Sequence, residues 1–410
     1  MLGGNQIGAL LGILFLPGMN PALASAADKR FVQVVSPGQS IQAAIDRAAS
    51  RGWVFILPGV YRERGDATNG LNINAAINLV GLSTPRQRVV LENSGGQSNG
   101  IVAVPRDRND CMSCHSSLAP PFALKPGITG HLRMRQPMIH DLTIRGITIR
   151  NFINNGLFTE NIDRFVIDDV ESVGNKNYGI FPTLSKNGVV SHNHVSGSED
   201  AGLWVETSEN VSVTNNLLEG NVIGMEVSNS DDISVSENES RGNSVGFGVF
   251  LLSGLFADHP GLKRITLRNN SVHDNNKENT ARPGSLAAEL PSGTGIMFLG
   301  ADDSHITRNH VENNDLTGIA LVDVCVAFSG GSHDCATDPK VTPEFLADQD
   351  ASNNEVARNV LVHNGGSPPP TPFAFAAGDL TLLSFGVGNC YAHNRFTTSF
   401  SIIGDLPACP

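Results

Sequence analysis

Residues 177–182 read NYGIFP, and the same glycine-centred pattern returns as DAGLWV at 200–205, VIGMEV at 222–227 and SVGFGV at 244–249. Counted from Gly156, the glycines are separated by 23, 23, 22 and 22 residues. A fixed period of this length is typical of solenoids, in which no single repeat can bury its apolar side chains alone. The sequence therefore predicts a stack of similar coils.

Apolar and polar residues alternate between the glycines, as in VSVT at 211–214 and ISVS at 233–236. Alternation with a period of two indicates β-strands with one buried face. A coil of 22 or 23 residues holds three short strands and three turns, which predicts an all-β, single-stranded, right-handed parallel β-helix of roughly ten coils. Recurring asparagines fit its turns, because asparagine tolerates a left-handed backbone and its amide can bond neighbouring coils. The series comprises Asn193, Asn215, Asn238, Asn270, Asn309, Asn359 and Asn394.

One end of this β-helix is expected to be closed by a helix between Ser40 and Arg51. Apolar residues recur there at helical spacing, and Ser40 is a suitable N-cap. A cap is needed because the end of a solenoid otherwise exposes unpaired strand edges. We expect one β-helix domain over residues 27–410, with insertions at about 105–135, 251–292 and 325–352.

The first 26 residues predict export. They carry no charged side chain, and the apolar run from Ile7 to Phe15 is too short to span a bilayer. Ala24-Ser25-Ala26 supplies the small-residue pattern of a signal-peptide cleavage site, although the usual basic residue near the start is absent. The expected location is the periplasm or the outside of the cell, with no membrane span.

Composition excludes two classes of protein. The chain has 410 residues with a formal net charge of −12, so it has no excess of positive charge with which to bind nucleic acid. Hydrophobic residues make up 40% and charged residues 17%, which is unlike an intrinsically disordered chain.

The repeats resemble a bacterial family of exported parallel β-helix repeat proteins, and the opening strands resemble the pectin-lyase-like superfamily. The resemblance rests on residues 177–182, 198–208, 221–228, 291–295 and 317–321, and at the start on 54–63 and 77–81. Members of that family occur beside a c-type cytochrome, so the resemblance implies a c-type cytochrome as a partner. It implies no particular chemistry.

Cys111, Cys114 and His115 form a Cys-x-x-Cys-His motif. In exported bacterial proteins this pattern attaches haem c: the two thiols bind the vinyl groups, and the histidine becomes an iron ligand. The motif therefore predicts haem c on this loop, with His115 as the metal-binding residue. Two alternatives remain open, a disulfide between the two cysteines and a labile metal or redox dithiol.

A second candidate site follows from strand parity, that is, from the alternation of side chains between the two faces of each glycine-marked strand. If the residue after each repeated glycine points inward, then Phe181, Trp204 and Glu226 form an outward column with Glu206 beside it. Aromatic rings stack on sugar faces, and carboxylates accept hydroxyl hydrogen bonds, bind calcium or transfer protons. The alternative is that residues on this face form an ordinary buried patch beneath the insertion at 255–292. No catalytic residue can be assigned from the sequence.

The remaining cysteines are paired by proximity, Cys325 with Cys335 and Cys390 with Cys409. Two functions compete. We favour an accessory protein that carries haem c and acts with a periplasmic c-type cytochrome, because the motif and the family resemblance agree. The alternative is a carbohydrate-binding or lyase- or epimerase-like polysaccharide-modifying protein that uses the outward face.

Overall fold

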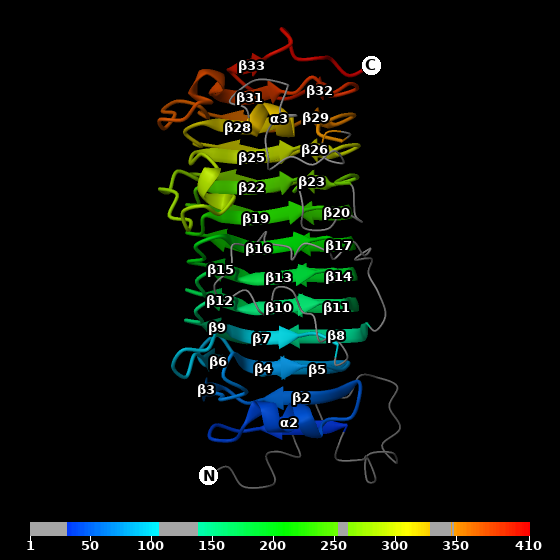
Figure 1. Cartoon of the computed structure of the whole chain (residues 1–410), viewed down its shortest axis with the longest axis vertical. Helices are drawn as coiled ribbons and strands as arrows, with labels where there is room; N and C mark the ends of the chain where they lie inside the picture. The colour runs from blue at the N-terminus through cyan, green and yellow to red at the C-terminus, as the bar shows by residue number, and fades with distance from the viewer. Residues whose placement is uncertain (1–30, 106–137, 253–260, 329–345, 347) are drawn as a thin grey trace.

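The computed structural model describes residues 31–105, 138–252, 261–328, 346 and 348–410. These residues form a rod of stacked coils with the N-terminus at one end and the C-terminus at the other (Figure 1). Strands from successive coils pair in parallel into three sheets of 12, 11 and 10 strands, here called sheets A, C and B. The predicted parallel β-helix and its count of roughly ten coils are confirmed.

Each coil from β2 to β31 contributes one strand to each sheet, the first and last coils contribute fewer, and the order of strands in a sheet follows the chain. Sheet A contains β1 (Val32–Val35), β2 (Gly52–Ile56), β5 (Ile77–Gly81), β8 (Ile139–Arg145), β11 (Ile162–Asp168), β14 (Lys186–Ser191), β17 (Glu209–Thr214), β20 (Asp231–Ser236), β23 (Thr266–Arg268), β26 (His305–Thr307), β29 (Glu355–Ala357) and β32 (Cys390–Ala392). Sheet B contains β3 (Gly59–Tyr61), β6 (Val89–Glu92), β9 (Ile147–Arg150), β12 (Glu171–Val173), β15 (His194–Ser196), β18 (Leu217–Glu219), β21 (Glu239–Arg241), β24 (Ser271–His273), β27 (His310–Glu312) and β30 (Val360–Val362). Sheet C contains β4 (Asn69–Ile73), β7 (Asn99–Ala103), β10 (Leu157–Glu160), β13 (Ile180–Thr183), β16 (Ala201–Glu206), β19 (Ile223–Ser228), β22 (Val245–Phe250), β25 (Thr294–Leu299), β28 (Thr317–Val322), β31 (Gly378–Leu383) and β33 (Ser399–Ser401).

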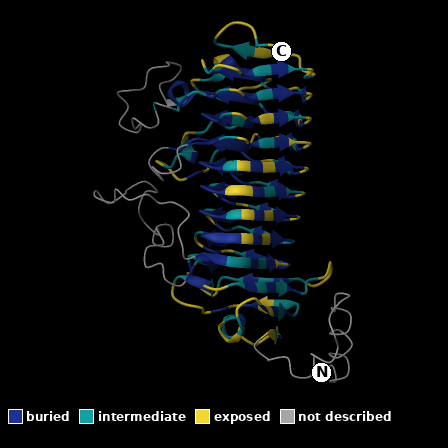
Figure 2. Cartoon of the chain, turned by 90° about the vertical axis from the view of Figure 1, so that its right-hand side faces the viewer, coloured by how far each residue is buried: buried dark blue, intermediate teal, exposed yellow. Residues whose placement is uncertain are grey.

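The repeated glycines lie in register on sheet C, as predicted. Gly179 shows why the position accepts no side chain: a Cβ there would lie 2.5 Å from the carbonyl oxygen of Gly202 and 2.2 Å from Cγ1 of Val195. The residues after the glycines point into the core and are at most 2% exposed. Their inward column consists of Ile180, Leu203, Met225, Phe247, Ile296 and Ile319. Buried residues recur at every level of the stack (Figure 2).

A continuous asparagine ladder joins the coils, with one correction to the predicted series. Asn216, not Asn215, is the member on its coil: its side-chain oxygen accepts hydrogen bonds from the backbone and side-chain nitrogens of Asn193, and its own nitrogens donate to Asn238. Asn215 is exposed at the preceding position with a φ of 57°. Two adjacent asparagines share one turn, and the sequence alone does not show which of them points inward.

The predicted capping helix is present as α2 (Ile41–Arg47). The hydroxyl of Ser40 accepts a hydrogen bond from the backbone N–H of Ala43 at 3.1 Å, which is the expected N-cap contact. Ile41 and Ala44 are buried, so the helix covers the N-terminal end of the core. The described part of the later coils also contains the short helices η2 (Ala287–Glu289), α3 (Val324–Phe328) and η3 (Ala374–Ala376).

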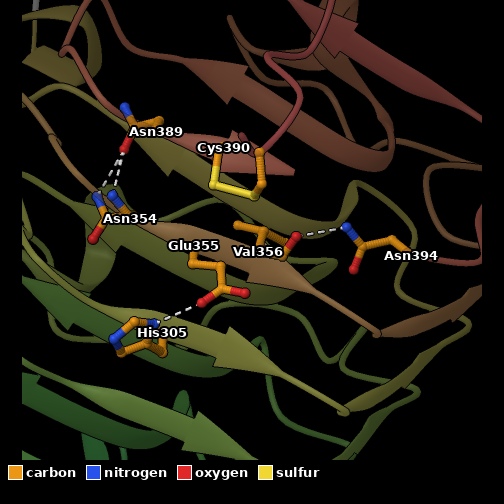
Figure 3. The surroundings of a disulfide bond; sticks show 8 residues. His305, Asn354, Glu355, Val356, Asn389, Cys390 and Asn394 are labelled. Atoms are coloured by element: carbon orange, nitrogen blue, oxygen red, sulfur yellow. Dashed lines mark hydrogen bonds and ion pairs between the residues drawn. A yellow bond between two sulfur atoms is a disulfide. The ribbon is translucent and has the colours of Figure 1, made fainter. Parts of the chain in front are cut away.

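The tail is tied to the last coils by the predicted disulfide between Cys390 and Cys409. Figure 3 shows this bond beside the end of the ladder, where Asn394 donates to the carbonyl oxygen of Val356 at 2.7 Å. For the other predicted pair, Cys335 lies outside the described residues, so its bond to Cys325 stays a prediction. Residues 1–26 also lie outside them, and export stays a prediction. Within the described residues, no helix has the length and apolar character needed to cross a bilayer.

Candidate functional site

The structure brings the four predicted carbohydrate-binding residues together on the outer face of sheet C. Trp204 pairs with Glu226 across neighbouring coils, and Glu206 pairs with Thr183 and with Ser228. Phe181 lies one coil before Trp204, and the two rings stack with centroids 4.3 Å apart. The predicted parity of this sheet is therefore confirmed.

This face is not an open platform, however. Phe181 is 3% exposed and Trp204 is 7% exposed. The two rings lie nearly parallel, at 6°, so the face of Phe181 that points along the rod is occupied by Trp204. Tyr178 packs against both rings, with centroids 4.8 Å from Phe181 and 4.7 Å from Trp204. Phe181 consequently packs within this cluster, as the alternative of a buried patch expected, and its contact with a sugar stays a prediction.

A pocket opens next to this aromatic cluster. Polar and aromatic side chains from the coils of β13, β16 and β19 form its floor, and the segment around η2 forms its opposite wall. The insertion predicted at 251–292 therefore covers part of the face, as the alternative interpretation expected. The residues that line the pocket are Tyr178, Asp200, Trp204, Ile223, Glu226, Phe250, Leu252, Ser285, Leu286, Ala287 and Leu290.

Two carboxyl groups face this pocket with raised pKa values. Burial raises the pKa of Asp200 to about 7, although a hydrogen bond from the Tyr178 hydroxyl acts in the opposite direction. The pKa of Glu226 lies well above its usual range, because the group is buried and because Asp200 and Glu206 place negative charge nearby. The pocket therefore contains two carboxyl groups whose protonated forms are favoured relative to a carboxyl group in water.

A chain of hydrogen bonds fixes the orientation of Glu226. The indole N–H of Trp204 donates to the hydroxyl of Ser228 at 2.5 Å, and this hydroxyl donates to Oε1 of Glu226 at 3.3 Å. Glu206 does not line the pocket. Its Oε2 accepts a hydrogen bond from the Thr183 hydroxyl at 2.9 Å, and burial raises its pKa to about 7. Glu206 thus acts on the pocket through its charge.

These pKa shifts predict how stability depends on pH. The folded state holds protons on Asp200, Glu206 and Glu226 that the unfolded state releases near pH 4. Their stabilising effect is therefore complete below the unfolded pKa values and is lost as the pH rises through about 7. We expect the urea midpoint to fall between about pH 5 and about pH 8, and to fall less in Glu226→Gln. The same fall in both proteins would contradict the burial of an ionisable Glu226.

Tyr178 and Asp200 are pocket residues that the sequence analysis missed. Both belong to the quoted repeats, where they stand just before the glycines that begin the motif of their coils. Parity arguments apply along strands, whereas these two residues lie in the turns that enter sheet C. Tyr178 stands one residue before its glycine, where a later coil has Ile223. Asp200 stands two residues before its glycine, where a later coil has Val222. The available signal was the change from an apolar aliphatic residue to an aromatic and an acidic one at these two positions.

A second pocket follows on the same sheet, over β25, β28 and β31, and it is mainly apolar. It shares Leu286 and Leu290 with the first pocket, so the segment around η2 separates the two. Its lining comprises Leu286, Glu289, Leu290, Pro291, Met297, Leu299, Leu316, Thr317, Ala320, Val322, Ala327, Phe373, Ala376, Thr381 and Leu383. This pocket offers apolar packing and no pair of carboxyl groups.

The predicted haem-binding residues Cys111, Cys114 and His115 lie outside the described residues. Within the residues that the structure describes, no group of three or more histidine, cysteine, aspartate or glutamate side chains is arranged to hold a metal ion. The expected use of the outward carboxylates for calcium therefore finds no support in the described geometry, and haem attachment rests on the motif.

Comparison with solved structures finds the same architecture in two mannuronan C-5 epimerase modules and a tailspike protein. The A-module of the Azotobacter vinelandii mannuronan C-5 epimerase AlgE4 is 16% identical, with a TM-score of 0.53 over 87% of this chain and 92% of that chain. The A-module of AlgE6 is 14% identical, with a TM-score of 0.51 over 90% and 94%. The Dettilon tailspike protein is 10% identical, with a TM-score of 0.52 over 90% of this chain and 59% of that one. At these identities the likeness establishes the fold alone.

A search of curated proteins finds no significant match to this sequence. The family model described as "Right handed beta helix region" matches residues 138–277 and 252–397. Together these matches span residues 138–397, which is 260 of the 410 residues. They cover the coils that carry the glycine column, the asparagine ladder and the pocket. The chain therefore belongs to the right-handed β-helix family.

Proposed function

We propose that this protein binds a glycan at the pocket on sheet C and cleaves it by acid–base chemistry. The observation that carries the proposal is the pair Asp200 and Glu226: two carboxyl groups face one pocket, beside Trp204, and burial raises the pKa of each. Neighbouring carboxyl groups with perturbed pKa values in one pocket are typical of acid and base catalysts.

The two carboxyl groups have distinct roles in this proposal. The raised pKa of Glu226 favours its protonated form, and in this proposal Glu226 donates its proton to the oxygen of the glycosidic bond as the bond from carbon to that oxygen breaks. A water molecule adds to the sugar carbon, and Asp200 accepts the proton that this water releases. Hydrolysis thus yields two shorter saccharides, and one water molecule is consumed.

The neighbouring side chains support these roles. The Tyr178 hydroxyl donates to Asp200, which favours the ionised form of the base. The Ser228 hydroxyl holds Glu226 in place, and the indole of Trp204 holds Ser228. Trp204 also presents its ring to the pocket, where an aromatic ring can pack on the apolar face of a sugar. The β-helix fold of the two epimerase modules is consistent with a glycan substrate.

Trp204→Ala is expected to weaken oligosaccharide binding by about tenfold, since it removes the ring beside which the sugar packs. Calorimetric titration with oligosaccharides identified on a glycan array measures the effect. Trp53→Ala is the matched control, because Trp53 is the other of the two tryptophans in the chain and is exposed on β2, far from the pocket in the sequence. Equal binding by both folded variants would contradict a sugar site at Trp204.

As a second function, we propose that the loop with Cys111, Cys114 and His115 carries haem c and that the protein acts with a c-type cytochrome in the periplasm. The Cys-x-x-Cys-His motif favours this proposal. Expression in a host with cytochrome c maturation should give a Soret band and a mass gain of one haem, and both should disappear in Cys111→Ser/Cys114→Ser. A colourless, unmodified wild-type protein would contradict haem attachment and would leave the glycan proposal unaffected.

A further inference from the structure

The charges around the pocket are of one sign. Asp200 and Glu226 are the only ionisable acidic or basic side chains among its lining residues, and neither lysine nor arginine lines it within the described residues. Glu206, on the same face, adds a third carboxyl group, which raises the pKa of Glu226 through its charge. A ligand that enters this pocket therefore meets carboxyl groups and no neutralising cation from the described part of the chain.

Three basic side chains of the neighbouring coils have partners away from the pocket. Lys176 lies 2.5 Å from Glu199, and Arg241 pairs with Glu219 and Glu239 of sheet B, each at 2.9 Å. Lys277 follows β24 on a later coil, and its ammonium group donates to the carbonyl oxygen of Gly220 at 2.7 Å. Because these cations already have partners away from the pocket, none of them is placed to bind a negative group of a ligand there.

We infer that the pocket selects uncharged sugar units and discriminates against uronates, an inference that rests on the proposed function. A uronate would place its carboxylate close to Asp200 and Glu206, whose carboxyl groups ionise as the pH rises through about 7, so that like charges meet in a poorly solvated site.

An uncharged sugar matches the same surroundings. Its hydroxyl groups can exchange hydrogen bonds with Tyr178 and Asp200, which are half-buried at the rim. Its carbon–hydrogen faces can pack against Trp204, Ile223 and Phe250. The pocket thus satisfies both the polar and the apolar surface of an uncharged sugar without a counter-ion.

The inference is tested by comparing neutral hexasaccharides with oligouronates of equal length at about pH 7.5. The neutral probes are cellohexaose, xylohexaose and maltohexaose, and the charged probes are hexagalacturonate and hexamannuronate. We expect the best neutral probe to bind at least about tenfold more tightly than the best uronate. Asp200→Asn should reduce this preference by about tenfold, since it removes an ionisable carboxyl group from the pocket.

Glu199→Gln is the matched control for charge. Glu199 adjoins Asp200 in sequence, but its side chain is exposed and paired with Lys176, so its loss should leave the preference unchanged. Tighter binding of a uronate than of every neutral probe would overturn the inference and leave the proposed glycan site standing. Equal preference in Asp200→Asn and wild type would also overturn it. Failure of every probe to bind would instead contradict the proposed function itself.

Discussion

Glu226→Gln should lower the rate of glycan cleavage by about 100-fold or more, because general acid catalysis typically contributes this much. The variant keeps the shape of the side chain and a hydrogen-bond donor but cannot release a proton to the leaving oxygen. Binding should change little, since glutamine keeps the shape of the protonated carboxyl group that the raised pKa of Glu226 favours. The measurement is the rate constant at saturating concentration of the best neutral hexasaccharide, with the affinity determined separately.

The control for this variant is Glu209→Gln. Glu209 begins β17, three residues after Glu206. Its side chain is exposed at the start of this strand of sheet A. It should retain wild-type cleavage. If the Glu226→Gln variant binds and cleaves like the wild type, Glu226 is not the catalytic acid. If the variant loses binding but keeps the rate, Glu226 recognises the substrate instead.

Asn216→Ala should lower the free energy of unfolding by about 3 kcal/mol, because it leaves several buried partners without a hydrogen bond. The side-chain oxygen of Asn216 accepts from the backbone and side chain of Asn193, and its nitrogen donates to the carbonyl oxygen of Val190 and to Asn238. These contacts cross three coils, so the loss interrupts the ladder in the middle of the rod. Urea denaturation measures the change.

Asn215→Gly is the comparison for this prediction. Asn215 is exposed and has a φ of 57°, which glycine adopts without strain. Its replacement should change stability by only a few tenths of a kcal/mol. The two substitutions affect adjacent residues of one turn, so their difference reports the ladder alone. Similar losses in both variants would mean that the turn, and not the stacked amides, determines stability.

The fold could be predicted from the sequence because its determinants are periodic. Gly179 and its counterparts recur once per coil, since a side chain at that position would collide with the next coil. The same stacking repeats the inward residues, so parity along each strand identified Ile180 and Leu203 as core and Trp204 and Glu226 as outward. The ladder was located to within one residue, and the error at Asn215 arose where two asparagines are adjacent.

The site was only partly predictable. Periodicity placed Trp204, Glu206 and Glu226 on one face, but it does not indicate which other segments of the chain pack against that face. The burial of Phe181 against Trp204 depends on ring orientation, and the wall around η2 comes from an insertion that interrupts the repeat. Tyr178 and Asp200 depart from the repeat at turn positions. A search for the periodic pattern therefore finds the outward column but passes over these two turn residues.

A crystal structure of Glu226→Gln with the best-binding neutral hexasaccharide would test the central claim most directly. The account predicts a sugar ring packed against Trp204, with a glycosidic oxygen within hydrogen-bond distance of the side chain at position 226 and a water molecule or sugar carbon near Asp200. An oligosaccharide bound on sheet A or sheet B, with the pocket on sheet C unoccupied, would contradict it.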